Sequence, residues 1–305
     1  MRQTDIATTD WSKVPARDRK MIVGSVYVHR DLGNAIRAQI DENRESAPLF
    51  PEPHCILLTG ESGSGKSSLL KSYLAANPPS RIDGVLRQPV LLLELPVKAN
   101  MLGAATVMLR ALNDPGSEIG TLEKKSERVR IQLKLQKVEV VFVDEFQHIV
   151  ESSGERTLNK VGDWLKQQAK MTGIPFVLSG LPNSSVIVDV NAQFARICPY
   201  RYHLGPFKWD DQANRKAFRL FLAEVDKQLP FDMLTRLADV DLAQKLHLAS
   251  EGSVGRLMLL IRKAAMCAID RGAACVEMED LAFAFDRILA PLSPLDENPF
   301  WTEAS

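Results

Sequence analysis

Long hydrophobic runs, paired cysteines and an excess of charge of either sign are all missing from this sequence of 305 residues. No apolar stretch is long enough to cross a bilayer, and the opening residues MRQTDIATTDW lack the apolar centre of a secretory signal. Lysine plus arginine and aspartate plus glutamate both number 38, so the charge balance gives no independent argument for nucleic-acid or membrane binding. We therefore expect a cytoplasmic protein without a membrane partner.

Cysteine is scarce as well, and the four residues are scattered as Cys55, Cys198, Cys267 and Cys275. No two of them form a C-x-x-C pair, and none of the five histidines stands near them at a metal-ligand spacing. The pattern predicts neither a zinc site nor a disulfide framework, and it suits a reducing compartment.

What the sequence does contain is an alternation of short apolar segments and helical patterns. Strands are predicted at residues 55–59, 90–95, 138–143, 175–179 and 200–204, and helices at residues 31–43, 67–76, 101–112, 122–137 and 158–171. This order predicts an α/β fold in which a parallel sheet is flanked by helices.

After Trp209 the strands stop and only helical patterns follow, at residues 210–227, 240–249, 255–271 and 278–289. The switch predicts a domain boundary near Gly205. We expect an N-terminal segment (1–50), an α/β core (51–205), a small all-helical lid (206–290) and an irregular tail (291–305) that contains three prolines.

A phosphate-binding loop follows the first predicted strand. Its text, GESGSGKS at residues 60–67, fits G-x-x-x-x-G-K-[ST] and stands between a strand and a helix, as the motif requires. Glycines let backbone N–H groups surround phosphate oxygens, and the helix adds its positive end. Lys66 is expected to reach the β- and γ-phosphates of ATP, and Ser67 to ligate Mg²⁺. The predicted nucleotide contacts are Gly60, Glu61, Ser62, Gly63, Ser64, Gly65, Lys66, Ser67 and Ser68.

A second motif of ATPases ends the strand at residues 138–143. Asp144 follows this apolar segment and is expected to hold the Mg²⁺ shell, while Glu145 polarises the attacking water as general base. Two weaker candidates are Ser179, which either contacts the γ-phosphate or begins a turn, and Arg256, which either closes onto the phosphates or is simply solvated.

The order of these motifs resembles an AAA+ ATPase, and more narrowly the TniB/TnsC family of transposition regulators, which are related to MuB. The resemblance covers roughly residues 25–290 and rests on several phrases: LLTGESGSGK (57–66), LPVK (95–98), DEFQH (144–148), LK (165–166), IPFVLSG (174–180), QFAR (193–196) and GSVGR (252–256). DEFQH and IPFVLSG are its more specific parts.

This resemblance implies an ATP-dependent protein that oligomerises on duplex DNA as a ring or helical filament and links target selection to a transposase. Hydrolysis would drive disassembly. Arg196 matches the family position that reaches a neighbouring subunit's ATP, although an intrachain ion pair is the alternative. Lys98, Arg156 and Lys160 are candidate contacts to DNA phosphates, against the alternative of plain solvation.

The family also implies partner contacts at the chain ends. Residues 292–301 place apolar and aromatic side chains in the tail, and we expect them to dock a transposase or a target-selector protein. Disorder of this tail, or packing of Phe300 and Trp301 on their own body, is the alternative.

Three rival functions share the same nucleotide motifs. An insertion-sequence helper or helicase loader would differ mainly in its partner protein. A P-loop kinase of small molecules has no need of Glu145, of a trans arginine or of a helical lid. A nucleotide-binding scaffold that scarcely hydrolyses ATP is disfavoured by the intact Lys66, Asp144 and Glu145.

Overall fold

The computed structural model describes residues 9–82 and 84–301. Residues 1–8 of the predicted N-terminal segment and residues 302–305 of the predicted tail lie outside the described residues. The chain divides into two compact units: a sheet unit of residues 31–204 and a helical unit of residues 1–30 and 205–305.

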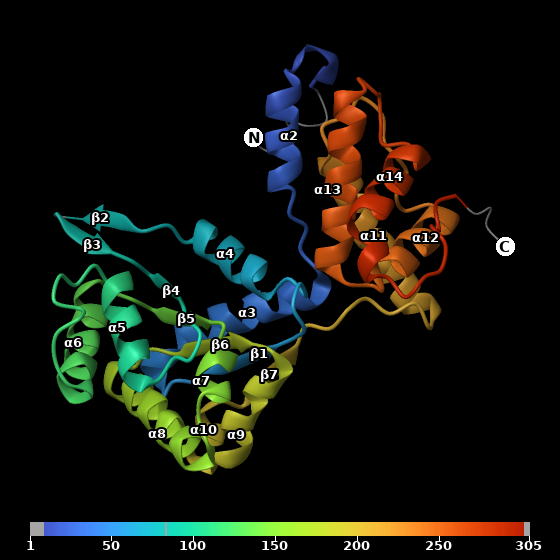
Figure 1. Ribbon diagram of the computed structural model, residues 1–305. Coiled ribbons are helices and arrows are strands. Elements are labelled where there is room, and N and C mark those ends of the chain that lie inside the picture. Colours follow the sequence, from blue (N-terminus) through green and yellow to red (C-terminus); the bar gives the residue numbers. More distant parts are fainter. Residues whose placement is uncertain (1–8, 83, 302–305) are drawn as a thin grey trace. The chain divides into compact units, whose positions relative to one another are not determined.

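The sheet unit contains a five-stranded parallel sheet in the order β4-β5-β6-β1-β7 (Figure 1). Its strands are β1 (Ile56–Thr59), β4 (Val90–Glu94), β5 (Val140–Asp144), β6 (Phe176–Gly180) and β7 (Tyr200–His203). Strands β1, β5 and β6 are buried along their whole length, as the run of apolar residues in each predicts for the middle of a parallel sheet. The predicted parallel sheet is therefore confirmed.

Helices cover both faces of this sheet. α3 (Asp31–Ser46) and α4 (Lys66–Ala76) pack on one face, and α5 (Met101–Ala111), α6 (Leu122–Leu135), α8 (Glu155–Thr172) and α10 (Ala192–Ile197) pack on the other (Figure 1). Alternate residues of a strand serve opposite faces, so Leu57 joins the second core while Ile56 and Leu58 join the first.

Several short elements of this unit were not predicted. They are the antiparallel hairpin of β2 (Ser80–Ile82) and β3 (Val85–Arg87), and the helices α7 (Gln147–Glu151) and α9 (Val186–Val190). Each spans five residues or fewer, which is too short to display a hydrophobic period. α10 is likewise short and begins with a local signal, since the Asn191 side chain accepts a hydrogen bond from Phe194 N–H.

The helical unit is built from α2 (Ala16–Ser25), α11 (Gln212–Gln228), α12 (Val240–Ser250), α13 (Val254–Asp270) and α14 (Met278–Ile288). α2 lies along α13 (Figure 1), with Val23 and Val26 buried in the same core as Leu257 and Ile261. Residues 1–30 thus group with the helices after Leu204, whereas the sequence suggested a separate segment of residues 1–50. α3, the second half of that segment, belongs to the sheet unit.

Between residues 291 and 301, the described part of the predicted tail, there is no regular secondary structure beyond a short 3-10 turn at Ala290–Leu292, but some of these residues are packed. Phe300 is buried against Phe285, with ring centroids 6.2 Å apart. Asn298 Nδ2 donates to the Ala282 carbonyl (2.9 Å) and to Asp286 Oδ1 (2.8 Å). Of the two aromatic residues, only Trp301 is exposed, at 59%.

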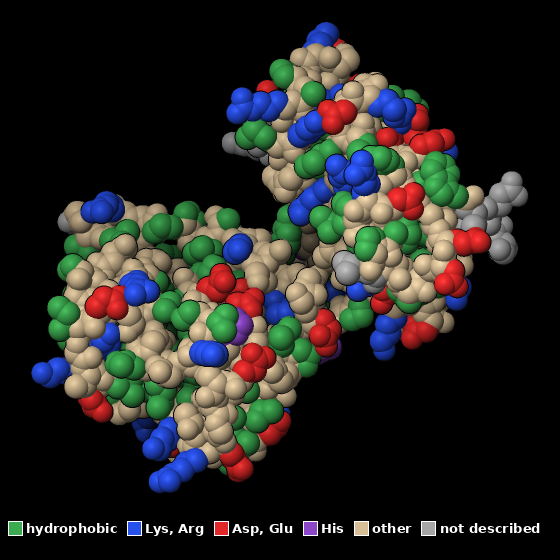
Figure 2. Space-filling view, in the orientation of Figure 1, with side chains coloured by type: hydrophobic (Ala, Val, Ile, Leu, Met, Phe, Trp, Pro, Cys, Tyr) green, Lys and Arg blue, Asp and Glu red, His purple; other side chains and the backbone are tan. Residues whose placement is uncertain are grey.

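On the face drawn in Figure 2, basic side chains are interspersed with acidic ones, as the balanced composition suggests. Among the helices formed by residues 9–82 and 84–301, none combines the length and the apolarity that crossing a membrane requires.

Candidate nucleotide-binding site

The loop between β1 and α4 is shaped by its glycines. Gly63 and Gly65 have φ of +75° and +99°, in the left-handed region that side chains disfavour. A Cβ on Gly60 would lie 2.5 Å from the Leu204 carbonyl oxygen and 2.7 Å from Ser64 Oγ. The loop can therefore curl as closely as it does only with glycine at these positions, and α4 begins directly after it.

Lys66 is the first residue of α4 and turns its side chain back into this loop. Its Nζ donates to the carbonyl oxygens of Gly60 (2.7 Å) and Glu61 (3.0 Å), and the residue is only 8% exposed. Burial lowers the pKa of Lys66, while the nearby charges of Asp144, Glu145 and Glu61 oppose that shift. Its hydrogen-bond partners are neutral oxygens, so a phosphate in the loop would supply the anion that this buried ammonium lacks.

The two predicted acids lie at the carboxyl end of β5. Asp144 is buried, and its Oδ1 accepts hydrogen bonds from Ser179 Oγ (2.8 Å) and from the backbone N–H of Glu145 (3.0 Å). β5 and β1 both pair with β6, so Ser179 stands beside Leu58 and next to the strand that leads into the phosphate loop. The sheet thus brings the two motifs to one edge, as parallel strands require.

Ser179 takes a role that neither reading of the sequence foresaw. It is completely buried, and its hydroxyl orients the Asp144 carboxylate. In this position Ser179 fixes the acid expected to carry the Mg²⁺ shell. Mg²⁺ at such sites is held by one or two oxygen ligands from the protein together with substrate phosphates and water, and Asp144 and Ser67 are the chain's candidates.

Glu145 adopts an uncommon backbone conformation, with φ of +57°. A left-handed conformation of a residue other than glycine costs about 1 kcal/mol and persists where the surroundings enforce it. Its carboxylate oxygen Oε2 accepts a hydrogen bond from Gln147 Nε2, and His148 Nε2 lies 3.8 Å from the same atom. Gln147 is itself fixed, because it is buried and its Oε1 accepts from Leu181 N–H (3.1 Å).

Gln147 and His148 are therefore site residues that sequence reasoning noticed only as part of the DEFQH phrase. Their spacing, two and three residues after Glu145, is a local signal. The turn that folds them back onto Glu145 depends on its left-handed backbone, which no local pattern reveals.

The structure places the two candidate arginines in ion pairs. Arg196 is at the surface with its side chain 68% exposed, and one guanidinium nitrogen lies 2.6 Å from Glu52 Oε2. This is the intrachain pair named as the alternative, and Lys170 lies 3.5 Å from the other Glu52 oxygen. Arg256, on the first turn of α13 in the helical unit, pairs with Glu251.

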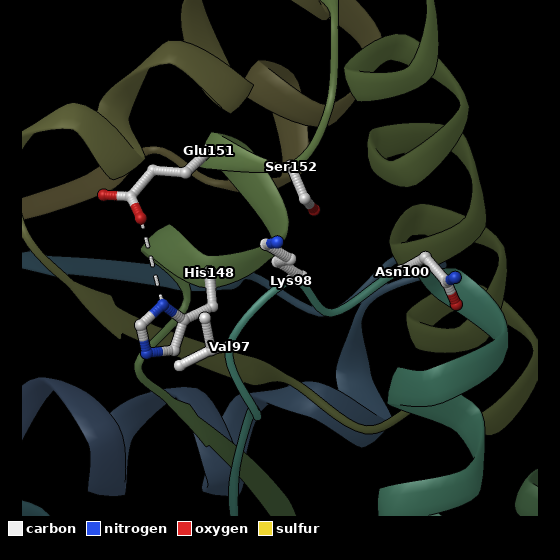
Figure 3. A pocket seen from close by; sticks show the side chains of 6 residues that line it. All are labelled: Val97, Lys98, Asn100, His148, Glu151 and Ser152. Atoms are coloured by element: carbon white, nitrogen blue, oxygen red, sulfur yellow. Dashed lines mark ion pairs between the residues drawn. The ribbon is translucent and has the colours of Figure 1, made fainter.

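The three basic candidates for DNA contact are all exposed residues of the sheet unit. Arg156 and Lys160 lie on the first turns of α8. Lys98, with φ of +59°, lies in the loop after β4 and lines a pocket with His148 of α7 (Figure 3). The structure therefore brings Lys98 near the acid-bearing end of β5.

Comparison with known proteins gives two kinds of match. The model of the family described as "Bacterial TniB protein" matches residues 29–201. No curated protein sequence matches this chain.

Solved structures match over most of the chain at low identity. The Aeropyrum pernix ORC2 protein with ADPNP and ADP has a TM-score of 0.62 and 15% identity, and the match covers 88% of this chain and 71% of that one. The Aeropyrum pernix ORC1 protein in complex with DNA has a TM-score of 0.59 and 16% identity, and the match covers 88% of this chain and 69% of that one. Drosophila ORC bound to DNA has a TM-score of 0.54 and 15% identity, and the match covers 95% of this chain and 70% of that one. At such identities the likeness is one of fold, and the fold is that of AAA+ proteins.

Proposed function

Because this chain belongs to the TniB family of bacterial proteins, whose model matches residues 29–201, we propose that it is an ATP-dependent, DNA-binding regulator of transposition. The observation that carries the enzymatic part is the meeting of Lys66, Asp144 and Glu145 at one edge of the sheet. The protein is an ATPase of the AAA+ type. Hydrolysis of ATP drives its disassembly from DNA and so sets how long it stays bound.

The chain's own residues divide the work of hydrolysis. Backbone N–H groups of the loop and the Lys66 ammonium bind the β- and γ-phosphates of the substrate. Mg²⁺, when bound, would supply positive charge that offsets the negative charge developing on the phosphates, and Asp144 and Ser67 would hold it. Ser179 keeps the Asp144 carboxylate oriented. Glu145 orients the attacking water and accepts its proton, and Gln147 positions that carboxylate.

DNA binding is supported by the family and by the fold neighbours, two of which are complexes with DNA. Lys98, Arg156 and Lys160 are exposed and contact backbone phosphates, which gives affinity with little sequence specificity. A protein that handles duplex DNA in a bacterium works in the cytoplasm.

Assembly completes the site from a second copy of the chain. The subunits form a ring or a helical filament on DNA, and Arg196 leaves Glu52 to reach the ATP of its neighbour. Its exposure supports this role, since a surface ion pair is worth only about 1 kcal/mol or less and is easily exchanged for a phosphate. The assembled protein then links a target-selector protein to the transposase.

Negative-stain electron microscopy with duplex DNA, with and without a slowly hydrolysed ATP analogue, tests the proposal. We expect rings or filaments on DNA that require the analogue and that the Lys66→Ala variant fails to form. A protein that stays monomeric and ignores DNA in every nucleotide state would contradict it. Nucleotide-dependent binding of a replicative helicase would then favour a helicase loader, and DNA-independent phosphorylation of a metabolite would favour a small-molecule kinase.

A further inference from the structure

A pocket of about 560 Å³ opens beside the carboxyl end of β5. The loop after β4 contributes one wall and α7 the other, and the lining residues are Val97, Lys98, Asn100, His148, Glu151 and Ser152 (Figure 3). Two of these side chains are basic, two carry neutral hydrogen-bonding groups and one is acidic. In Figure 3, Lys98 rises from its loop between His148 and Asn100, so its ammonium is presented to the pocket.

His148 stands between the general base and this pocket. Its Nε2 lies 3.8 Å from Glu145 Oε2, and its Nδ1 lies 3.9 Å from Glu151 Oε2. Both separations are longer than a hydrogen bond. The buried Nδ1 has no hydrogen-bond partner among the described residues. The ring is thus near two carboxylates but fixed by neither, which leaves it free to reorient when a third group enters.

The two walls of the pocket are joined to each other and to the catalytic acid. Ser152 Oγ, at the end of α7, donates to the Ala99 carbonyl oxygen of the Lys98 loop (2.6 Å). Gln147, at the start of the same helix, donates to Glu145. α7 has only five residues, so Gln147 at its start and Ser152 just after its end lie within about two helical turns of each other.

We propose, on the basis of the proposed function, that a phosphate group of duplex DNA binds in this pocket between Lys98 and His148 and thereby repositions Glu145. With the pocket empty, Gln147 donates to Glu145 Oε2 and the His148 ring lies 3.8 Å from the same oxygen. A phosphate draws the His148 ring toward Lys98 and away from that oxygen, which opens it to the attacking water and raises the rate of hydrolysis. His148 acts through Glu145 and is a positioning residue.

Glu151 makes the pocket selective for a phosphate that is anchored elsewhere. Its Oε1 is held by Asn183 Nδ2 (3.0 Å), so a carboxylate remains at the rim and repels a free anion. DNA can offset that repulsion through additional phosphate contacts at other basic residues, whereas inorganic phosphate cannot. The ligand is therefore a DNA phosphodiester rather than released phosphate.

The test measures steady-state ATP hydrolysis and DNA affinity for the wild-type protein and for the His148→Gln, Lys98→Ala and Lys134→Ala variants. We expect saturating duplex DNA to raise wild-type kcat at least about fivefold, the lower end of usual coupling between sites. In His148→Gln this stimulation is lost, while DNA affinity stays within about threefold and the KM for ATP is unchanged. Lys98→Ala loses stimulation and also DNA affinity. Lys134→Ala removes an exposed lysine on α6 and behaves as the wild type.

Three outcomes would overturn the inference. The first is stimulation of His148→Gln equal to the wild type. The second is wild-type hydrolysis that does not respond to DNA, in which case ATP-dependent assembly on DNA, seen by microscopy, would still support the proposed function. The third is stimulation by inorganic phosphate alone that Lys98→Ala abolishes, which would assign the pocket to a free anion.

Discussion

Two sets of buried polar side chains, one in each unit of this protein, serve different purposes. In the sheet unit, Lys66, Asp144 and Gln147 gather at one edge of the sheet, around the end of β5 and the loop after β1. In the helical unit, the buried Asp226 accepts backbone N–H groups of Thr235 (3.0 Å) and Leu237 (3.1 Å) and closes a loop.

The first set consists of polar groups available to bind a ligand. The second consists of polar groups whose hydrogen bonds are made within the folded chain. The Lys66 ammonium is buried and donates to the carbonyl oxygens of Gly60 and Glu61, which carry no net charge to balance its own. The Asp226 carboxylate, by comparison, has its hydrogen bonds provided by the chain itself. Substitutions in the first set should therefore remove activity and preserve stability, and substitutions in the second should do the reverse.

The most complete loss is expected from Lys66→Ala, because nucleotide binding, hydrolysis and assembly should all fail together. The substitution removes the positive charge from the phosphate loop, so ATP affinity should fall at least about 100-fold and DNA assembly should be lost with it. The free energy of unfolding should change little, because the loop keeps its glycines. Calorimetric titration and thermal unfolding measure the two quantities. Assembly on DNA that survives without bound nucleotide would refute the coupling between them.

Glu145→Gln should preserve ATP binding and greatly slow ATP hydrolysis. The amide cannot accept the proton of the attacking water, so kcat should fall by about 10²–10⁴-fold while ATP still binds. The bound ATP should stabilise assemblies on DNA, which time-resolved microscopy or light scattering can follow. Faster disassembly of this variant than of the wild type would count against Glu145 as the base.

Arg196→Ala should lower hydrolysis only where subunits meet. If the guanidinium acts on a neighbour's ATP, the loss should reach about 10³-fold in DNA-bound assemblies and should vanish in dilute monomers. Rates measured across a range of protein concentrations check this. Glu52→Gln is the matched control, because it breaks the same ion pair and leaves the arginine in place. An equal loss in monomers would remove the trans role.

Asp226→Ala reverses the pattern of the three preceding variants. Leaving the buried N–H group of Leu237 and the partly buried N–H group of Thr235 without an acceptor should reduce the free energy of unfolding of the helical unit by about 1–3 kcal/mol. ATP affinity should be retained at temperatures where the protein is folded. Denaturant unfolding at several pH values measures the loss. Loss of ATP affinity at full folding would contradict the separation of roles.

The pH dependence of that measurement has a definite sign. Burial raises the pKa of Asp226 above its ordinary value of 3.8, so the folded state binds this proton more tightly than the unfolded chain. Its contribution to stability is full below that ordinary value and declines as the pH rises through the folded pKa. The Asp226→Ala variant should lack this decline.

The elements that depend on residues close together in the sequence could be predicted from it. The apolar runs of β1, β5 and β6 and the loop from Gly60 to Ser67 are local patterns, and the structure has them at the predicted positions within a few residues. Contacts between residues far apart in the sequence could not be predicted in this way. The pairing of Arg196 with Glu52 joins residues 144 positions apart, and Arg262 reaches the Val26 carbonyl across 236 positions.

The same distinction explains the site. The residue types at Lys66, Asp144 and Glu145 follow from their motifs, but the hydroxyl that orients Asp144 comes from β6, 35 residues further along the chain. The position of Ser179 at a strand end was visible, and its bond to Asp144 required knowing that β5 and β6 are neighbours in the sheet.

The smallest effect is expected at the exposed end of the tail. Phe300 is buried in the core of the helical unit, where it packs against Phe285. Trp301, by contrast, is 59% exposed, so its contribution to stability should be small. We infer that Trp301 is the part of the tail available to a transposase or target selector. Trp301→Ala should weaken that binding about 5- to 30-fold, as loss of an interface aromatic does, and change the free energy of unfolding by less than about 0.5 kcal/mol. Pull-down titration with the transposase and denaturant unfolding measure the two effects, and ATP-driven assembly on DNA serves as the control. Unchanged partner binding would leave the tail with a structural role alone, carried by Phe300.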